Sequence, residues 1–133
     1  MQTSDLMYLL DTNVVLWLLT DDRRLGASAR HRLASSAAVY VSAVTDVELA
    51  IKSLLGRLMV PDELHRRMAE QGLGTLALTA DHAEVLSEFP ELIRHDPFDR
   101  ILLAQAKFGG LKFLTADRRL LALGYDWIID ATQ

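Results

Sequence analysis

Two kinds of segment alternate along the chain. Short apolar runs end at a polar residue or a turn, and each is followed by a stretch in which apolar residues recur at helical spacing. Runs this short and apolar are typical of buried strands. Strands that alternate with helices predict an α/β fold with a parallel sheet covered on both faces. The predicted strands are residues 6–10, 39–41, 76–78, 112–114 and 127–129.

Helix signals stand between these runs. Asp96 can cap a helix whose first residue is Pro97 and which ends before Gly109 and Gly110. Pro61 is likewise predicted to begin a helix, and Thr79 to cap one. The other predicted helices cover residues 14–19, a stretch from Ser28, residues 44–58 and residues 115–123.

Length and composition narrow the class of protein. A chain of 133 residues, half of them apolar, fits one packed domain over 1–133 with no linker. No apolar run approaches the roughly 18 residues of a membrane span, and the acidic N-terminal segment does not resemble a signal peptide. We expect a soluble cytoplasmic protein without membrane contact. Because cysteine is absent, any metal must be bound by oxygen or imidazole.

The acidic residues form the most informative constellation. Asp11 directly follows the first predicted strand, and Asp117 follows the fourth by three residues. Asp96 and Asp99 lie at one helix start, and Glu48 lies one to two turns into another helix. Because the carboxyl ends of parallel strands share one edge of the sheet, these five acids are predicted to converge there.

Crowded carboxylates repel one another and require a cation. Oxygen ligands without cysteine or a histidine pair indicate Mg²⁺ or Mn²⁺ rather than zinc. Such an ion can activate water and hold a phosphodiester for in-line attack. The formal net charge of −4 does not favour unassisted binding of nucleic acid, so metal and arginine would have to hold a polyanion.

The sequence resembles the PIN domain family, and more narrowly the VapC-type toxin ribonucleases of toxin–antitoxin pairs. The matching segments are LLDTNVVLWLL (9–19), VSAVTDVELAIKSLLGRL (41–58), HDPFDRILLAQA (95–106) and FLTADRRL (113–120). The resemblance implies a three-layer α/β/α, Rossmann-like fold with a mainly parallel sheet. It also implies a metal-dependent endoribonuclease, a homodimer and a cognate VapB-type antitoxin as partner.

The resemblance places a catalytic, metal-binding quartet on Asp11, Glu48, Asp99 and Asp117. Asp96 is then a fifth ligand, a helix cap, or both. Asn13 and Thr115 occupy small polar positions that can orient a carboxylate or a bound water. Two arginines next to the acids are candidate contacts to RNA phosphate, and each can equally be a solvated ion pair: Arg100 and Arg118.

Other noticeable residues are predicted to be structural. His95 adjoins the acids, but lone histidines are seldom ligands, so we expect a surface loop residue. Trp17 and Trp127 are expected in the core. The aliphatic stretch 54–60 either covers the core as a helix end or forms a partner surface.

Two alternatives remain open. A phosphoacceptor receiver domain is also a small parallel α/β fold with acids and Mg²⁺, but it needs an acid pair after the first strand and a lysine after a late one. Here Thr12 and Asn13 follow Asp11, and Lys112 lies inside a predicted strand. A catalytically inactive PIN-like module that only binds RNA or protein is the second alternative.

Overall fold

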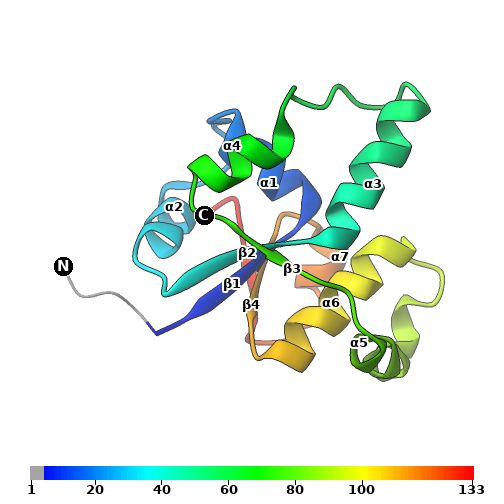
Figure 1. The fold of residues 1–133 in the computed structure, drawn as a ribbon. Helices are drawn as coiled ribbons and strands as arrows, with labels where there is room; N and C mark the ends of the chain where they lie inside the picture. Colours follow the sequence, from blue (N-terminus) through cyan, green and yellow to red (C-terminus); the bar gives the residue numbers. More distant parts are fainter. Residues whose placement is uncertain (1–4) are drawn as a thin grey trace.

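The chain folds around a parallel sheet with strand order β3-β2-β1-β4-β5 (Figure 1). The computed structural model describes residues 5–133. The strands are β1 (Met7–Leu10), β2 (Ala38–Ser42), β3 (Gly74–Leu76), β4 (Lys112–Thr115) and β5 (Ile128–Asp130). The helices are α1 (Thr12–Leu19), α2 (Ala27–Ala34), α3 (Ala43–Leu54), α4 (Leu64–Glu70), α5 (Ala80–Val85), α6 (Pro97–Gly109) and α7 (Arg118–Leu121), with 3₁₀ turns η1 (Leu86–Glu88) and η2 (Pro90–Leu92).

Both faces of the sheet are buried, as the apolar strands predict. Leu9 and Phe113 point into a core shared with α6 and α7, against which α5 packs. Leu10 and Leu114 point to the opposite face, into a core shared with α1, α2 and α4. All four side chains are fully buried because side chains alternate between the faces along each strand. The predicted α/β/α layers with a parallel sheet are therefore confirmed.

The strand order creates a crevice at one edge of the sheet. The chain runs outward from β1 to β2 and β3, then crosses to β4 on the other side of β1. Ligands of open α/β sheets bind where the strand order reverses, at the carboxyl ends of the strands. In this fold that position lies between the ends of β1 and β4.

Polar side chains cap the helices that begin at this edge. Asp11 caps α1, Ser42 caps α3 and Asp117 caps α7, each accepting a hydrogen bond from a backbone N–H of its helix. Asp96 caps α6 in the same way, with Pro97 as the first helical residue, as predicted. The capping residues thereby bring carboxylates to the helix ends beside the crevice.

Several predicted helix boundaries differ from the structure. Helix α3 ends at Leu54 and not at residue 58, and α5 ends at Val85 and not at Phe89. Helix α4 begins at Leu64 and not at Pro61, because Glu63 adopts a left-handed conformation with φ of 55° that cannot continue a helix backwards. The helix predicted over 115–123 is reduced to α7. Thr115, the first residue of the predicted helix, belongs to β4. Its carbonyl accepts a hydrogen bond of 2.8 Å from the backbone N–H of Ala131.

The aliphatic stretch 54–60, which begins with the last residue of α3, lies largely at the surface. Leu54 and Met59 are 88% and 93% exposed, and Leu55 is more than half exposed. These side chains do not cover the core. Among the described residues, no helix is both long and apolar enough to span a membrane.

Candidate metal centre

A pocket of about 380 Å³ opens at the carboxyl ends of the central strands. It contains all five acids that the sequence predicts to converge. Its lining consists of Asp11, Thr12, Asn13, Trp17, Glu48, Lys52, Asp96, Asp99, Ala116 and Asp117. The acids come from four segments of the chain because β2, β1 and β4 are neighbours in the sheet and α6 begins at the same edge.

Asp11 lines the pocket and is 7% exposed. It follows β1 directly, and its backbone N–H donates to the carbonyl of Leu114 in β4 at 3.0 Å. Its Oδ1 accepts from the backbone N–H of Thr12 at 2.8 Å, and its Oδ2 accepts from the hydroxyl of Thr115 at 2.7 Å. Burial nevertheless raises the pKa of Asp11, and the charges of Glu48 and Asp117 add to the increase.

Thr115 links the first and last acids. Its hydroxyl donates to Asp11 and accepts a hydrogen bond of 3.0 Å from the backbone N–H of Asp117. Asp117 in turn accepts from the N–H of Arg119 through Oδ1, which leaves Oδ2 directed toward His95. The end of β4 thus holds the carboxylate of Asp11 and the backbone of Asp117.

Glu48 enters the pocket from α3 and is 4% exposed. Its Oε1 accepts a hydrogen bond of 2.7 Å from the hydroxyl of Thr12, and its Oε2 accepts from the ammonium group of Lys52 one helical turn away. That bond to Glu48 raises the pKa of Lys52. Lys52 therefore supplies a positive charge at the wall of an otherwise acidic pocket.

Asp96 and Asp99 reach the pocket from the first turn of α6. Asp96 caps the helix, as predicted, because its Oδ1 accepts from the backbone N–H of Phe98 at 2.8 Å, and it also lines the pocket. Its role as a metal ligand stays a prediction. Burial raises the pKa of Asp99 to about 8, with further contributions from the charges of Asp11, Asp96, Glu48 and Asp117. Electrostatic coupling of the other four acids to the carboxyl group of Asp99 reflects how tightly the cluster is packed.

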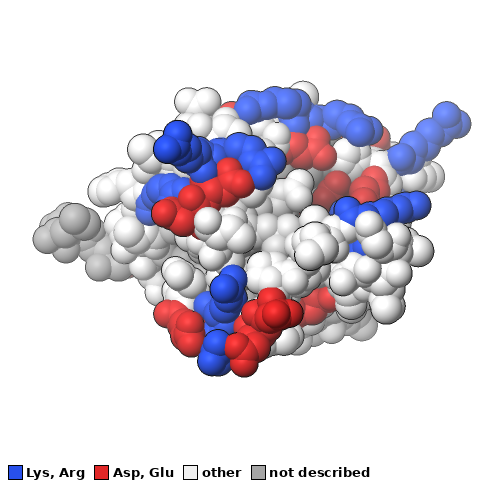
Figure 2. Space-filling model, turned by 90° about the horizontal axis from the view of Figure 1, so that it is seen from above, with Lys and Arg blue, Asp and Glu red and all other residues white. Residues whose placement is uncertain are grey.

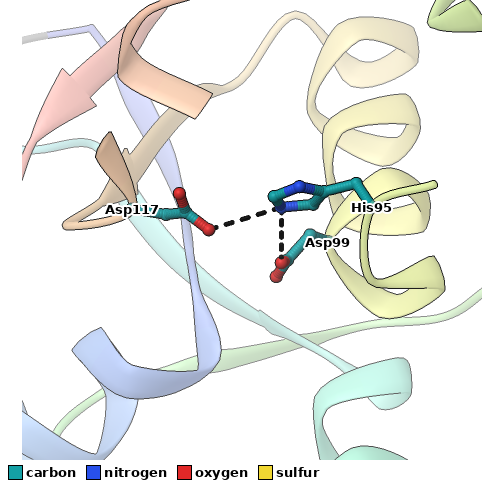
Figure 3. A group of neighbouring side chains, drawn as sticks. All are labelled: His95, Asp99 and Asp117. Atoms are coloured by element: carbon teal, nitrogen blue, oxygen red, sulfur yellow. Dashed lines mark ion pairs between the residues drawn. The ribbon is translucent and has the colours of Figure 1, made fainter. Parts of the chain in front are cut away.

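The prediction for His95 was wrong. Its side chain is only 7% exposed, and its Nε2 lies 3.1 Å from Oδ2 of Asp99 and 3.3 Å from Oδ2 of Asp117 (Figure 3). The only hint in the sequence is the spacing of four residues between His95 and Asp99. Two further pocket residues were missed, Thr12 and Lys52. Lys52 had a similar signal, because it lies four residues after Glu48.

The candidate RNA-binding arginines are engaged elsewhere. Arg100 donates from Nη2 to the carbonyl of Leu86 at 3.0 Å, on the side of α6 that faces η1. Arg118 pairs with Asp130 at 2.7 Å and also donates to Thr132. Neither residue lines the pocket.

Asn13 and Trp17 line the pocket from α1. Asn13 is exposed. Trp17, which we expected in the core, is only partly buried, and the guanidinium of Arg24 stands 5.0 Å from the centre of its ring. The indole therefore forms part of the pocket wall as well as contacting the apolar core behind it.

The donor set fits a hard divalent cation. Oxygen atoms of Asp99 and Asp117 and Nε2 of His95 all lie within 4.8 Å of one another. Carboxylates that raise one another's pKa are stabilised when a cation is bound among them. The acids and His95 therefore form a candidate cation site.

Comparison with known proteins finds a matching family and a related curated protein. The PIN domain family model matches residues 8–124. The chain is 28% identical over 114 residues to Ribonuclease VapC22 of Mycobacterium tuberculosis, covering 84% of this chain and 88% of that protein.

Solved structures with the same fold include three toxin–antitoxin proteins. In a toxin–antitoxin complex from Klebsiella pneumoniae, the matching chain is 22% identical with a TM-score of 0.64, covering 92% of this chain and 95% of that one. VapBC2 from Rickettsia felis, bound to a promoter DNA fragment, matches at 13% identity and a TM-score of 0.66, with 94% and 97% coverage. DNA-bound VapBC from Salmonella typhimurium matches at 20% identity and a TM-score of 0.66, and the match covers 94% of this chain and 98% of that one.

Proposed function

The chain belongs to the PIN domain family, and we propose that it is a single-domain, metal-dependent endoribonuclease acting as the VapC-type toxin of a toxin–antitoxin pair. The observation that carries this proposal is the convergence of five carboxylates on one pocket, where the pKa of Asp99 rises to about 8. The similarity to Ribonuclease VapC22 supports RNA as the substrate.

The pocket residues have different proposed roles. Asp11, Glu48, Asp99 and Asp117 would hold Mg²⁺ or Mn²⁺, and Asp96 adds negative charge at the rim. When bound, the ion supplies the positive charge that activates water and stabilises in-line attack on a phosphodiester. Two hydroxyl groups set the orientation of the carboxylates: Thr12 holds Glu48 and Thr115 holds Asp11. Such outer hydrogen bonds fix the direction of ligand oxygen atoms.

RNA must be held against an unfavourable overall charge of −4. From above, acidic and basic side chains alternate over the visible face and do not form one broad basic surface (Figure 2). The bound cation therefore provides the main attraction for the scissile phosphate, and Lys52 is the basic residue in the pocket lining. Substrate binding should depend on the metal more strongly than on salt.

The exposed apolar residues favour protein partners. Leu54, Leu55 and Met59 leave an aliphatic surface beyond α3 that the fold does not cover. Exposed apolar groups of this size are typical of interaction sites. The proposal therefore includes a homodimer and a VapB-type antitoxin. An arginine of the antitoxin, inserted among the carboxylates, would be an effective inhibitor.

The decisive experiment incubates the purified protein with structured RNA and Mg²⁺ or Mn²⁺. Cleavage should require the metal and should fall on the order of 100-fold or more in Asp11→Asn and Asp99→Asn, because each removes a charge that holds the ion. Asp62→Asn alters an exposed acid outside the pocket lining and should retain activity. Cleavage that persists unchanged in both pocket variants would reject the proposed active site. A wild-type protein that binds metal but cleaves no RNA would favour the inactive binding module.

A further inference from the structure

His95 is the unexplained polar group of the pocket. It lies in the segment between η2 and α6, and its imidazole points at the acids of α6 and of the β4–α7 turn (Figure 3). The side chain is 93% buried, as its exposed fraction is 7%. Its Nε2 is fully buried and has no hydrogen-bond partner among the described residues, although Asp99 and Asp117 lie close by.

A buried nitrogen without a hydrogen bond is costly. Leaving such a group unsatisfied costs about 1–3 kcal/mol. In the neutral ring with its proton on Nδ1, Nε2 presents a lone pair, and it then faces two carboxylate oxygen atoms that also carry lone pairs. The lone pairs of this nitrogen and of the two carboxylate oxygen atoms point toward the same space. A cation bound in that space would interact favourably with all three atoms.

The separations match the spacing of ligands around such a cation. Nε2 lies 3.1 Å from Oδ2 of Asp99 and 3.3 Å from Oδ2 of Asp117. Adjacent ligand atoms of an octahedral ion with bonds of about 2.1 Å stand about 3 Å apart. An ion could therefore be shared by these three atoms with small side-chain movements.

We propose that His95 is a nitrogen ligand of the divalent cation held by Asp99 and Asp117, and that this nitrogen makes the site prefer Mn²⁺ to Mg²⁺. The inference rests on the proposed function, since it concerns the same ion. Mg²⁺ and Mn²⁺ both accept carboxylate oxygen atoms, but only Mn²⁺ belongs to the first-row transition ions, whose affinity also extends to nitrogen ligands. A purely acidic pocket would lack this preference.

Pulsed electron paramagnetic resonance of the Mn²⁺-loaded protein tests the proposal directly, because it detects ¹⁴N nuclei bonded to the ion. Wild-type protein should show nitrogen coupling, and His95→Gln should lose it. His31→Gln, at an exposed histidine of α2, should keep the coupling. Absence of coupling in the wild type would mean that His95 only forms an ion pair with the acids, and the proposal would fail even if the variant did not fold.

Metal titration gives an independent readout. The Kd for Mn²⁺ should rise roughly 10–100-fold in His95→Gln, the range seen when groups supporting a metal are removed, with a smaller rise for Mg²⁺. An unchanged ratio of the two Kd values would overturn the preference. Nitrogen coupling in a protein that cleaves no RNA would leave the ligand role intact and reject only the nuclease.

Discussion

The hydroxyl of Thr115 donates a hydrogen bond of 2.7 Å to Oδ2 of Asp11, although 104 residues separate them in the chain. The contact exists because β1 and β4 are paired in the sheet, with Leu10 beside Leu114. It connects the two strand ends that form the floor of the acidic pocket. The bond also opposes the effect of burial on Asp11, since it lowers the pKa of that carboxyl group.

Thr115→Val should weaken metal binding without altering the fold. The valine keeps the shape but removes a donor to a buried carboxylate, which costs about 1–3 kcal/mol of stability. The Kd for Mg²⁺ should rise roughly 10–100-fold in calorimetric titrations. Thr75→Val, at an exposed position of β3, is the matched control. Equal affinity in both variants would show that the hydroxyl does not orient Asp11.

Lys52→Met should make the protein more dependent on metal. Lys52 supplies a positive charge to Glu48, so its loss leaves the carboxylates repelling one another until a cation binds. The rise in Tm produced by Mg²⁺ should be larger than in wild type. Lys107→Met removes a comparable lysine–glutamate pair away from the pocket and should leave the Mg²⁺ effect unchanged. A smaller effect in Lys52→Met would contradict this role.

The metal-free protein should become less stable as pH rises. The pKa of Asp99 is about 8 in the folded state, against an ordinary value of 3.8 for an aspartate side chain. Between these values the folded protein retains a proton that the unfolded chain has released, so the free energy of unfolding falls with increasing pH. Each pKa unit corresponds to about 1.4 kcal/mol, so the fall should be on the order of a few kcal/mol.

Urea denaturation in the presence of a chelator measures this dependence. The free energy of unfolding should be lower at about pH 8 than at about pH 5. Asp99→Asn cannot titrate and should show a flatter profile. A wild-type profile that is level or rises across this window would indicate that Asp99 ionises normally.

Divalent cations should stabilise the folded state. A ligand that binds only the native protein at a free concentration 100 times its Kd adds about 2.7 kcal/mol. Mg²⁺ should therefore raise Tm, and Glu48→Gln should reduce the shift, because Glu48 is a proposed ligand. Sodium chloride at matched ionic strength controls for screening of the acidic cluster. A Tm shift of equal size with sodium would argue against a specific ion site.

Local patterns predicted much of the fold and of the site. Asp96 followed by Pro97 predicted the start of α6, because the cap and the first helical turn depend only on adjacent residues. Apolar runs predicted where strands lie along the chain, within a few residues. Glu48, which the sequence predicts among the converging acids, is 4% exposed and lines the pocket.

Side-chain directions at the site were less predictable. Arg100 follows Asp99, but successive residues on a helix point about 100° apart, so Arg100 turns to η1 while Asp99 faces the pocket. His95 lies in a loop, as predicted, but its burial was not predictable, because no local pattern indicated that Asp99 and Asp117 would lie against its ring.

The sequence by itself determined that strands and helices alternate, that carboxylates follow the strands, and which residues begin the helices. These properties depend on the few residues around each position. Tertiary structure alone decided that β4 lies beside β1, that Thr115 reaches Asp11, and that His95 is buried against two acids. These contacts depend on strand pairing and packing between distant segments, which are set by the burial of the whole apolar surface.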